Sequence, residues 1–422
     1  MARIYEYQGK EVLQKHGAPI PRGKPAATPE EAKKIAREIG KPVALKAQIW
    51  VTGRFKAGGV KFAQTPEEAE KTAQELIGAE IKGLTVKTVL VEEKLDIDRE
   101  FYVGVIVNDS LKVKGPVLIF STEGGTDLEE VSARNPERVA TQVVDYRKGV
   151  GLAEAKQLIS KPSFNGVLSP ELLGELAKIT SSLYHAFKES DARAAEINPL
   201  ILTKDNHLYA ADCRFTIDDN SVFRHPEFGI KLPRDMQREP TELEELAWAI
   251  EEGDFRGTGY FTQMVPKIEG EGWLGFQGIG GGGSMLGASA LVTKGFKIAD
   301  YADTSGDPTA SKVYRVIKCI LAQPIDGYVL MGSALANQEQ WHHAHGIVKA
   351  FREETERRPG FPVVLLVAGN KEKEAHEIIR NGLKDVPLRW ELYGREYIYA
   401  TDFLVDRVKE LVEDYQKEKE GK

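Results

Sequence analysis

Residues able to bind phosphate follow the first extended apolar segment of the chain. Lys46 lies near the end of a predicted strand, and the glycine-rich run 52–61 comes shortly after it with Gly53 and Arg54. Glycines let a loop bring its amide groups close to phosphate oxygens, while Lys and Arg neutralise their charge. The Gly-Lys-Ser/Thr ending of a P-loop is missing from this run. A flexible, solvated basic loop therefore remains the alternative to a phosphate site.

Oxygen ligands suited to a divalent cation occur further along the chain. Asn198 and Asp212 lie on either side of a predicted hairpin turn, and Glu196 is close to the first of them. Amide and carboxylate oxygens are hard ligands that suit Mg²⁺, although Asn followed by Pro also favours an ordinary turn. Glu100 begins another predicted strand, where a surface ion pair with Arg99 is the simpler interpretation.

A second glycine-rich segment, 278–283, is followed by Ser284 and a helical pattern. It satisfies G-x-G-x-x-G, and Asp300 or Asp303 lies about 20 residues further on, as in a dinucleotide site. Amides at a helix N-terminus would equally suit a carboxylate or a phosphate, and 331–337 offers a second such end at the same sheet edge. Close packing of glycines under a neighbouring helix is the third interpretation.

Three of the eight histidines, His342, His343 and His345, fall on one predicted helix. Their spacing places them on different sides of that helix, and no H-E-x-x-H pattern occurs, which argues against a metal site. His342 and His343 are expected at the surface or in an interface.

Short strands and helices alternate irregularly in the first half, which indicates a mixed α and β domain. The spacing predicts a helix over 29–39, with Thr28 as its N-cap and Gly40 after its end. A second capped helix begins at 65–66 in the same way. Strands are predicted at 42–47, 88–92, 101–107 and 116–120, and a hairpin is predicted within 195–211.

The second half is more regular, with about five units of an apolar strand followed by a helix. This alternation predicts a parallel sheet with right-handed crossovers, helices on both faces and a ligand site at the carboxyl ends of the strands. The strands are predicted at 273–277, 298–299, 327–331, 363–367 and 389–393. A charged, proline-containing stretch separates the halves, so we predict a domain over 1–236, a linker over 237–258 and a domain over 259–422.

The overall composition narrows the class of partner. The chain has 57 Lys plus Arg against 64 Asp plus Glu, for a net charge of −7, and this mild acidity argues against nucleic acid. No apolar run approaches the ~18 residues of a membrane span. Two cysteines cannot build a disulfide framework. We therefore expect a soluble, cytoplasmic protein that binds neither nucleic acid nor a membrane.

Several motifs of the first half resemble the ATP-grasp half of succinyl-CoA synthetase β subunits, and they occur in the family's order. They are the segments 5–11, 52–61, 121–125 and 196–200. The resemblance extends through essentially the whole chain and implies an N-terminal ATP-grasp domain. In that family the equivalents of Lys46, Gly53 and Arg54 hold the nucleotide phosphates. Phe55 is a departure, because the common pattern has a small glycine there.

The same resemblance implies roles for acidic and amide side chains. Glu92 would lie at the adenine-side hinge, Glu100 would contact the nucleotide, and Asn198 with Asp212 would ligate Mg²⁺. Glu196 would face the place where a phosphohistidine of the partner subunit receives its phosphate. These assignments are carried over from the family and rest on the matching motifs.

The second half lacks the Gly-Gly-Ile-Val-Arg motif of succinate-type β subunits. It resembles instead the citrate-binding half of ATP-citrate lyase. The motifs are 282–284, 301–308 and 332–337. Such a chain is similar to the large subunit of citryl-CoA synthetases, with a flavodoxin-like doubly wound parallel sheet as its second domain. The resemblance implies a citrate pocket lined by Ser284, Ser305, Gly332, Ser333 and Asn337. Segment 367–370 departs from related enzymes, which have an arginine there.

These resemblances imply the β-type subunit of an ATP-dependent acid–CoA ligase that forms citryl-CoA from citrate, CoA and ATP. Phosphate would pass through a phosphohistidine on an α-type partner subunit, which also binds most of the CoA, and Mg²⁺ would be the cofactor. The chain would be inactive alone. A succinate–CoA ligase β subunit, the small subunit of a two-chain ATP-citrate lyase and a non-catalytic nucleotide-binding regulatory subunit remain open. ATP against GTP and the stoichiometry also remain open.

Overall fold

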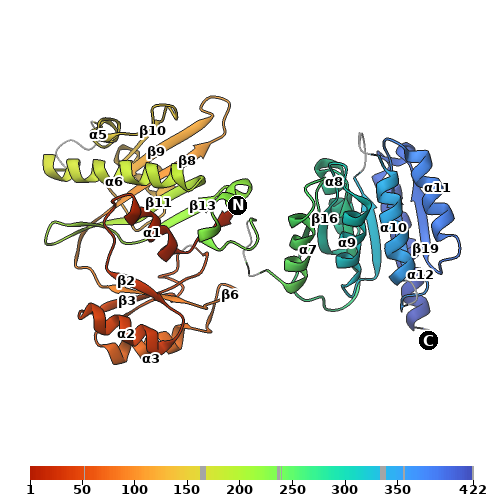
Figure 1. Cartoon of the computed structure of the whole chain (residues 1–422), viewed down its shortest axis with the longest axis horizontal. Coiled ribbons are helices and arrows are strands. Elements are labelled where there is room, and N and C mark those ends of the chain that lie inside the picture. The colour runs from red at the N-terminus through yellow and green to blue at the C-terminus, as the bar shows by residue number, and fades with distance from the viewer. Residues whose placement is uncertain are drawn as a thin grey trace. The chain divides into compact units, whose positions relative to one another are not determined.

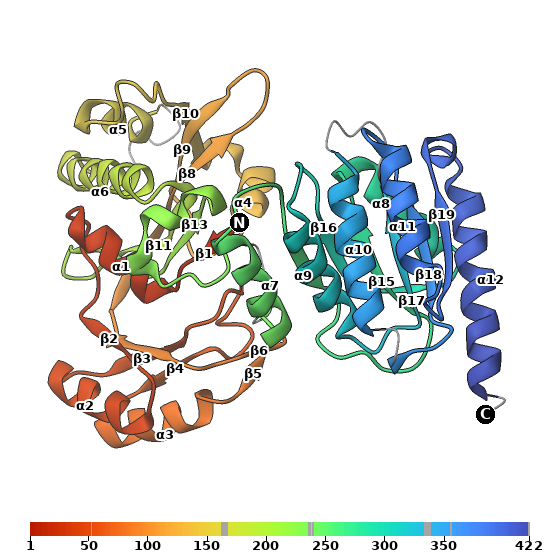
Figure 2. The ribbon, with the colours of Figure 1, turned by 45° about the vertical axis from the view of Figure 1, so that its right-hand side comes forward.

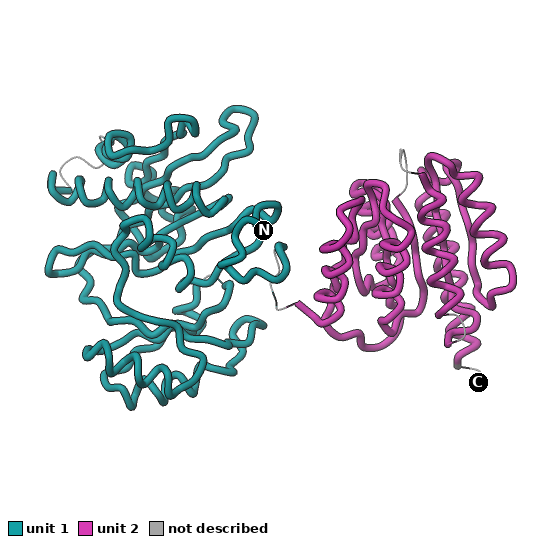
Figure 3. Tube along the Cα trace, in the orientation of Figure 1, with its two compact units in different colours: residues 1–239 teal, residues 240–422 magenta. Residues whose placement is uncertain are grey.

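The structure is a computed structural model that falls into two compact units, Met1–Glu239 and Pro240–Lys422 (Figure 3). Each unit has its own sheets and its own buried apolar core. None of the described helices is long and apolar enough to cross a membrane. The described residues are 1–51, 53–161, 168–234, 238, 240–332, 339–354 and 357–420.

The larger sheet of the first unit is antiparallel and has the order β1-β13-β11-β8-β9-β10, with β12 paired to β11 (Figure 1). Alternate residues of β8 point to opposite faces, because side chains alternate along a strand. One face packs on α5 and α6 over the main apolar core, and the other carries a smaller cluster with Tyr102 and Ile119. The strands are β1 Ala2–Arg3, β8 Ile97–Asn108, β9 Gly115–Ser121, β10 Val139–Val143, β11 Ala192–Thr203, β12 Leu208–Ala210 and β13 Cys213–Ile217.

The smaller sheet has the order β2-β7-β3-β4, and helices α2 and α3 pack beside it. The predicted helix caps are confirmed: Thr28 accepts a hydrogen bond from the Glu31 amide at 3.2 Å, and Gly40 is left-handed after α2. The strands are β2 Gly23–Ala26, β3 Val43–Ala47, β4 Val60–Ala63 and β7 Val89–Glu93, with a separate pair β5 Glu80–Ile81 and β6 Leu84–Thr85. The helices of this unit are α1 Glu6–Lys15, α2 Pro29–Ile39, α3 Pro66–Leu76, α4 Leu128–Arg134, α5 Leu152–Ile159 and α6 Pro170–Glu189, with 3-10 turns at Pro136–Arg138, Asp219–Arg224 and Pro226–Phe228.

The second unit contains a six-stranded sheet with the order β14-β16-β15-β17-β18-β19. All of its pairs are parallel except β14 with β16, and the order of the five parallel strands is that of a flavodoxin-like doubly wound sheet. Figure 2 shows α9, α10 and α11 over one face, while α8 and α12 cover the other. The strands are β14 Tyr260–Gln263, β15 Trp273–Gly278, β16 Lys297–Asp303, β17 Gly327–Met331, β18 Pro362–Leu366 and β19 Arg389–Tyr393. The helices are α7 Glu242–Glu252, α8 Gly281–Thr293, α9 Ala310–Leu321, α10 Trp341–Glu354, α11 Glu372–Leu383 and α12 Thr401–Glu420, with a 3-10 turn at Arg395–Tyr397.

The predicted fold class is confirmed, and two details differ from the sequence analysis. The range 237–258, expected as a linker, contains α7, whose Ala247 and Ile250 pack into the core of the second unit. A capping box at Thr241 and Glu244 starts this helix. The strand expected at 298–299 is the seven-residue β16, because Lys297 and Tyr301 through Asp303 continue the ladder on β15.

Candidate functional site

A cluster of buried charges joins five segments of the first unit. Lys46 comes from β3 and Glu92 from β7, which are antiparallel neighbours, while Glu6 and Lys10 come from one face of α1. The loop after β3 adds Arg54, and the turn between β12 and β13 adds Asp212. Three cationic and three anionic side chains therefore meet in one place, where few of them reach solvent.

Lys46 contacts two carboxylates and one carbonyl. Its Nζ lies 3.0 Å from Glu6 Oε1 and 2.6 Å from Glu92 Oε1, and it donates to the Ala211 carbonyl at 2.5 Å. Lys10 contacts the same three groups, with its Nζ 2.9 Å from Glu6 Oε1. Burial alone would lower the pKa of Lys46, but the surrounding carboxylates outweigh it and hold that pKa well above its ordinary value. Lys46 is therefore a permanent cation in this site.

Arg54 points inward from the glycine-rich loop. Its Nη2 lies 2.7 Å from Glu6 Oε2 and 2.6 Å from Asp212 Oδ2, while Nη1 donates to the Ala47 carbonyl at 3.1 Å. The loop can fold back in this way because Gly53 and Gly58 adopt positive φ angles of 67° and 78°. Arg54 is thus held beside Lys46 by a shared carboxylate partner, Glu6.

Two carboxylates of the cluster have pKa values that shift in opposite directions. Burial would raise the pKa of Glu6, but Lys10, Lys46 and Arg54 outweigh burial and lower that pKa well below its ordinary value. Burial dominates at Asp212, so its pKa is raised despite Arg54 beside it. A phosphate group that reached Lys46 and Arg54 would compete with Glu6 and Asp212 for the same cations.

The candidate metal ligands Asn198 and Asp212 are backbone neighbours, since the Asn198 amide donates to the Asp212 carbonyl at 3.0 Å. Asn198 Oδ1 accepts from the Gly125 amide at 2.7 Å, and Asp212 binds Arg54. The donor set of one amide oxygen and one carboxylate suits Mg²⁺, which keeps waters and substrate oxygens as its other ligands. Among the described residues, no group of three or more His, Cys, Asp or Glu side chains could hold a metal by itself.

Glu100 packs against the loop that precedes α4. A Cβ at Gly125 would lie 3.1 Å from the Glu100 carboxyl carbon, and the Gly124 amide donates to the Glu100 carbonyl at 3.0 Å. Burial raises the pKa of Glu100, and no basic side chain contributes to that shift. Glu100 therefore differs from Glu92, which was expected at the adenine-side hinge and which pairs with Lys10 and Lys46 in the charge cluster.

Glu196 lies on the face of the large sheet away from α6. It accepts a hydrogen bond from the Tyr102 hydroxyl at 3.0 Å, and Arg214 Nη1 lies 4.0 Å from its other oxygen. Burial raises the pKa of Glu196, as do the nearby charges of Asp212 and Asp127, while Tyr102 and Arg214 oppose the rise. Glu196 is therefore a partly buried carboxyl group with one oxygen fixed by a phenol.

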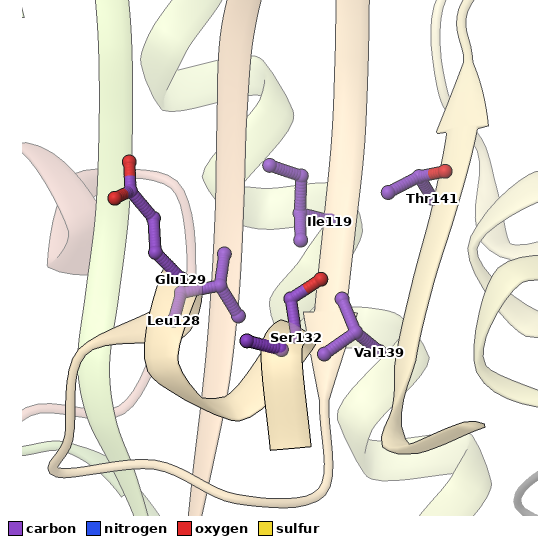
Figure 4. Close-up of a pocket in the computed structure, with 7 residues that line it drawn as sticks. Ile119, Leu128, Glu129, Ser132, Val139 and Thr141 are labelled. Atoms are coloured by element: carbon purple, nitrogen blue, oxygen red, sulfur yellow. The ribbon is translucent and has the colours of Figure 1, made fainter. Parts of the chain in front are cut away.

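A pocket of about 420 Å³ opens on the same face of the sheet. Glu196, Gly104, Ile119 and Thr141 are successive partners across β11, β8, β9 and β10, and the last two line the pocket. Figure 4 shows Leu128, Glu129 and Ser132 of α4 on the other side of it. Glu196 and the apolar pocket thus lie on the same face of the sheet, with Gly104 paired between Glu196 and Ile119.

The glycine-rich segment of the second unit is packed tightly around Ser284. A Cβ at Gly278 would lie 2.8 Å from Ser284 Cβ, and one at Gly283 would lie 2.7 Å from the Gly332 carbonyl oxygen. Gly332 itself has φ +106° and lies against the Ser284 backbone. The Ser284 hydroxyl donates to the Gly280 carbonyl. Close glycine packing therefore occurs here, while Gly281 and Gly282 at the start of α8 have open space around them.

The other predicted acid-site residues are only partly described. The Ser305 amide donates to Asp303 Oδ1 at 2.7 Å, at the carboxyl end of β16. Ser333 and Asn337 lie outside the described residues. Asp300 is fully buried and accepts from Gln323 at 2.8 Å, and burial raises its pKa well above the ordinary value. Asp300 therefore cannot reach a ribose, whereas Asp303, the other acidic candidate, is only partly buried at the carboxyl end of β16.

An arginine reaches segment 367–370 from the neighbouring loop. Arg395, after β19, donates to the Gly369 carbonyl at 2.8 Å, and its Nε lies 2.9 Å from Glu372 Oε2. Segment 367–370 itself contains no arginine. The structure therefore brings a guanidinium to the same edge of the sheet from the next connection.

The expectation that His343 lies at the surface is wrong. His343 is fully buried, and its Nε2 lies 3.0 Å from Thr304 Oγ1. Burial lowers the pKa of His343 to about 4, so this side chain is neutral at pH 7. His342 is partly exposed and stacks on Trp341, with ring centroids 3.7 Å apart.

Sequence reasoning missed Glu6, Lys10 and Tyr102 as site residues. A signal existed for the first two, because Glu6, Gly9, Lys10 and Leu13 form the buried face of α1 and an acid–base pair at i and i+4 interrupts it. Buried charges of this kind require partners from elsewhere in the fold. Tyr102 gave no comparable signal, because a tyrosine in a strand is ordinary core composition.

Comparison with known proteins was made for both units. The ATP-grasp domain family matches residues 3–202, and the family described as ATP citrate lyase citrate-binding matches residues 260–405. The succinate–CoA ligase [GDP-forming] subunit beta of Thermus thermophilus is 38% identical over 378 residues, which cover 89% of this chain and 93% of that protein. The [ADP-forming] subunit beta of Methanothermobacter thermautotrophicus is 33% identical, with coverage of 90% and 93%.

Among solved structures, the chain is similar to ATP citrate lyase from Methanothrix soehngenii in complex with citrate and coenzyme A. The TM-score is 0.75 with 18% identity, and the match covers 96% of this chain and 100% of that one, which shows a common fold. The identities with the β subunits extend over nearly the whole chain. The protein therefore belongs to the family of succinate–CoA ligase β subunits.

Proposed function

We propose that this chain is the β-type subunit of an ADP-forming ligase that joins citrate to coenzyme A. The observation that carries the choice of citrate is the match of residues 260–405 to the citrate-binding family, in a chain whose full-length relatives are succinate–CoA ligases. The ligase class itself is supported by the family and by the two cations that converge in the charge cluster.

In the first step, Lys46 and Arg54 bind the phosphates of ATP. Both cations are held ready by carboxylates, Glu6 for each of them and Asp212 for Arg54, so the incoming phosphates exchange one set of anionic partners for another. Asn198 and Asp212 would hold Mg²⁺, which neutralises charge on the phosphate oxygens. Lys46 and Arg54 stabilise the charge that develops as the γ-phosphoryl group leaves.

The phosphoryl group moves to a ring nitrogen of a histidine on the partner subunit, and ADP leaves. Glu196 is suited to accept a hydrogen bond from the other ring nitrogen, because Tyr102 occupies only one of its carboxylate oxygens. An accepted N–H bond would fix the orientation of the imidazole during transfer. The phosphohistidine then reaches the acid site, where a citrate carboxylate oxygen attacks the phosphorus and displaces the histidine to give an acyl phosphate. The CoA thiolate attacks the acyl carbon and displaces inorganic phosphate to form the thioester.

The acid site is proposed at the carboxyl ends of β15, β16 and β17. The N-terminus of the 13-residue α8 offers free amides beside Gly281 and Gly282, which have open space around them. Ser284, Ser305, Gly332, Ser333 and Asn337 are the proposed lining, and Arg395 supplies a guanidinium at the same edge.

The test is a panel of acids with the reconstituted complex of this chain and its α-type partner. We expect thioester formation from citrate with ATP and CoA, release of ADP and phosphate, and no activity from either subunit alone. Citryl-CoA that accumulates without cleavage distinguishes a synthetase from a lyase, which would release oxaloacetate and acetyl-CoA. Activity without the partner, or with succinate only, would refute the assignment.

A succinate–CoA ligase is the second candidate, because the relatives that match 89–90% of this chain carry that name. The same panel separates the two candidates. In a citrate–CoA ligase kcat/KM is higher for citrate than for succinate, and in a succinate–CoA ligase the order is reversed. Exchange of ATP for GTP in the same assay determines the nucleotide.

A further inference from the structure

A hydrogen bond between a tyrosine and Glu196 spans two strands of the large sheet. Tyr102 and Gly104 are two residues apart on β8, so both face the same side of the sheet. Gly104 is the direct cross-strand partner of Glu196 on β11. The Tyr102 hydroxyl donates to Glu196 Oε2 at 3.0 Å. Tyr102 must therefore extend along its own strand to reach a residue opposite Gly104.

The tyrosine ring can take this path only because residue 104 has no side chain. A Cβ at Gly104 would lie 2.8 and 2.9 Å from two carbon atoms of the Tyr102 ring, and it would also collide with the hydroxyl. Contacts under about 3 Å are not tolerated between carbon atoms, so the ring would have to rotate away. Gly104 has an ordinary negative φ angle. Its role here is to leave space and not to permit an unusual backbone.

The ring is otherwise well held. Tyr102 is 5% exposed and packs in a small apolar cluster with Val117 and Ile119 on β9. The cluster fixes the phenol body, and the hydrogen bond fixes the carboxylate. Arg214 Nη1 approaches the second oxygen, Glu196 Oε1, only to 4.0 Å. One oxygen of Glu196 is thus immobilised, while the other is available to a ligand.

We propose that Tyr102 is a positioning residue for Glu196, and that Gly104 serves the same end by making room for the phenol ring. This inference rests on the proposed function, in which Glu196 receives the ring N–H of the partner's histidine. A carboxylate with one oxygen tied to a rigid phenol presents its other oxygen in a fixed direction, which reduces the entropy lost when the imidazole docks.

The inference predicts a specific pattern of rate constants in the reconstituted complex. Transfer of phosphate from labelled ATP to the partner's histidine is measured in a single turnover, and ATP affinity is measured separately. Tyr102→Phe keeps the packed ring but removes the donor, and we expect the transfer rate to fall roughly ten- to a hundredfold, as for loss of one hydrogen bond to a charged group. The dissociation constant for ATP should stay unchanged, because Tyr102 does not contact the charge cluster in the structure.

Gly104→Ala provides an independent route to the same defect. It should lower the transfer rate about as much as Tyr102→Phe, since both break the bond to Glu196. The double variant should be no slower than the slower single variant, whereas independent roles would multiply the two losses. Gly115→Ala is the matched control: it adds the same methyl group to the neighbouring strand, where the nearest atom is 3.8 Å from the new Cβ.

The outcomes separate this inference from the proposed function. If the wild-type complex does not phosphorylate the partner's histidine from ATP, the proposed function and this inference fall together. If the wild-type complex does so and Tyr102→Phe transfers phosphate at the same rate, only the inference falls. Multiplicative losses in the double variant would overturn the role of Gly104. A melting temperature of Tyr102→Phe close to that of the wild type would attribute its rate loss to the hydroxyl group.

Discussion

The two units offer candidate anion sites of opposite kinds. In the first unit, Lys46 and Arg54 are buried charges neutralised by Glu6, Glu92 and Asp212. In the second, the predicted acid site is built from glycine backbone packed around Ser284. The first arrangement supplies strong charge but must release its own carboxylates. The second supplies weaker, fixed dipoles that need no rearrangement.

The largest effect is expected at Lys46. Lys46→Met leaves Glu6 and Glu92 with one cation fewer, which should cost roughly 3–5 kcal/mol of unfolding free energy, as for a broken buried ion pair. Histidine phosphorylation should fall by more than about a thousandfold, because the phosphates lose a direct cation. Lys10→Met is the matched control, since Lys10 contacts the same groups. It should destabilise the first unit comparably and reduce phosphorylation less; equal kinetic losses would contradict a special role for Lys46.

The next effect tests the backbone-built site. Gly332→Ala places a Cβ 2.6 Å from the Ser284 amide nitrogen at a φ of +106°, so it should cost roughly 1–3 kcal/mol of stability and impair thioester formation. Phosphorylation of the partner's histidine should persist, because that step uses the first unit. Gly282→Ala lies in α8 with open space around it and should not destabilise the protein. Loss of phosphorylation in Gly332→Ala would contradict the division of labour between the units.

A third prediction concerns acid stability of the second unit. The pKa of buried His343 is about 4, below the 6.5 of an exposed histidine, because burial disfavours its charged form. The unfolded chain therefore binds more protons between pH 4 and 6.5, so stability is complete above pH 6.5 and falls as the pH drops through this window. The loss amounts to about 3 kcal/mol at full extent. His343→Gln should flatten the pH dependence of chemical unfolding, and an unchanged slope would refute this.

The smallest effect is expected at Arg395. Its side chain is 66% exposed and already pairs with Glu372, so its electrostatic contribution is screened. Arg395→Gln should raise the KM for the acid less than about tenfold and leave the ATP dependence unchanged. A loss of activity as large as that expected for Lys46→Met would show that the second unit also depends on a charged side chain. This result would contradict the contrast drawn between the two units.

The regular parts of the fold were predictable because local patterns determine them. Helix α2 begins at its predicted N-cap and ends before Gly40, and β17 and β19 have the predicted bounds. The apolar strand runs of the second half alternate with helices, which restricts the sheet to few topologies. Segment 237–258 was mistaken for a linker because its many charges hide the short buried face of α7.

The site was less predictable, because its partners are far apart in sequence. Motifs singled out Lys46, Arg54, Asn198 and Asp212 as candidates. The pairing of Arg54 with Asp212 spans 158 positions, and no local pattern reports it. The same holds for Tyr102 and Glu196, which are 94 positions apart and meet through strand register. Buried His343 was misjudged although its helix gives a periodic signal, since Ile347 and Ala350 follow His343 at i+4 and i+7 on the buried face.

The position of α1 in the chain has a consequence for synthesis. Glu6 and Lys10 leave the ribosome well before Ala211, yet Lys10 binds the carbonyl of Ala211 and Ala2 in β1 pairs with Ile217 in β13. The charge cluster therefore cannot close until more than two hundred residues have been made. Contacts of such long sequence separation form late and slowly. In shorter nascent chains α1 would lack the Ala211 carbonyl and the β13 strand beside it, so protection of α1 from proteases is a marker for completion of the first unit.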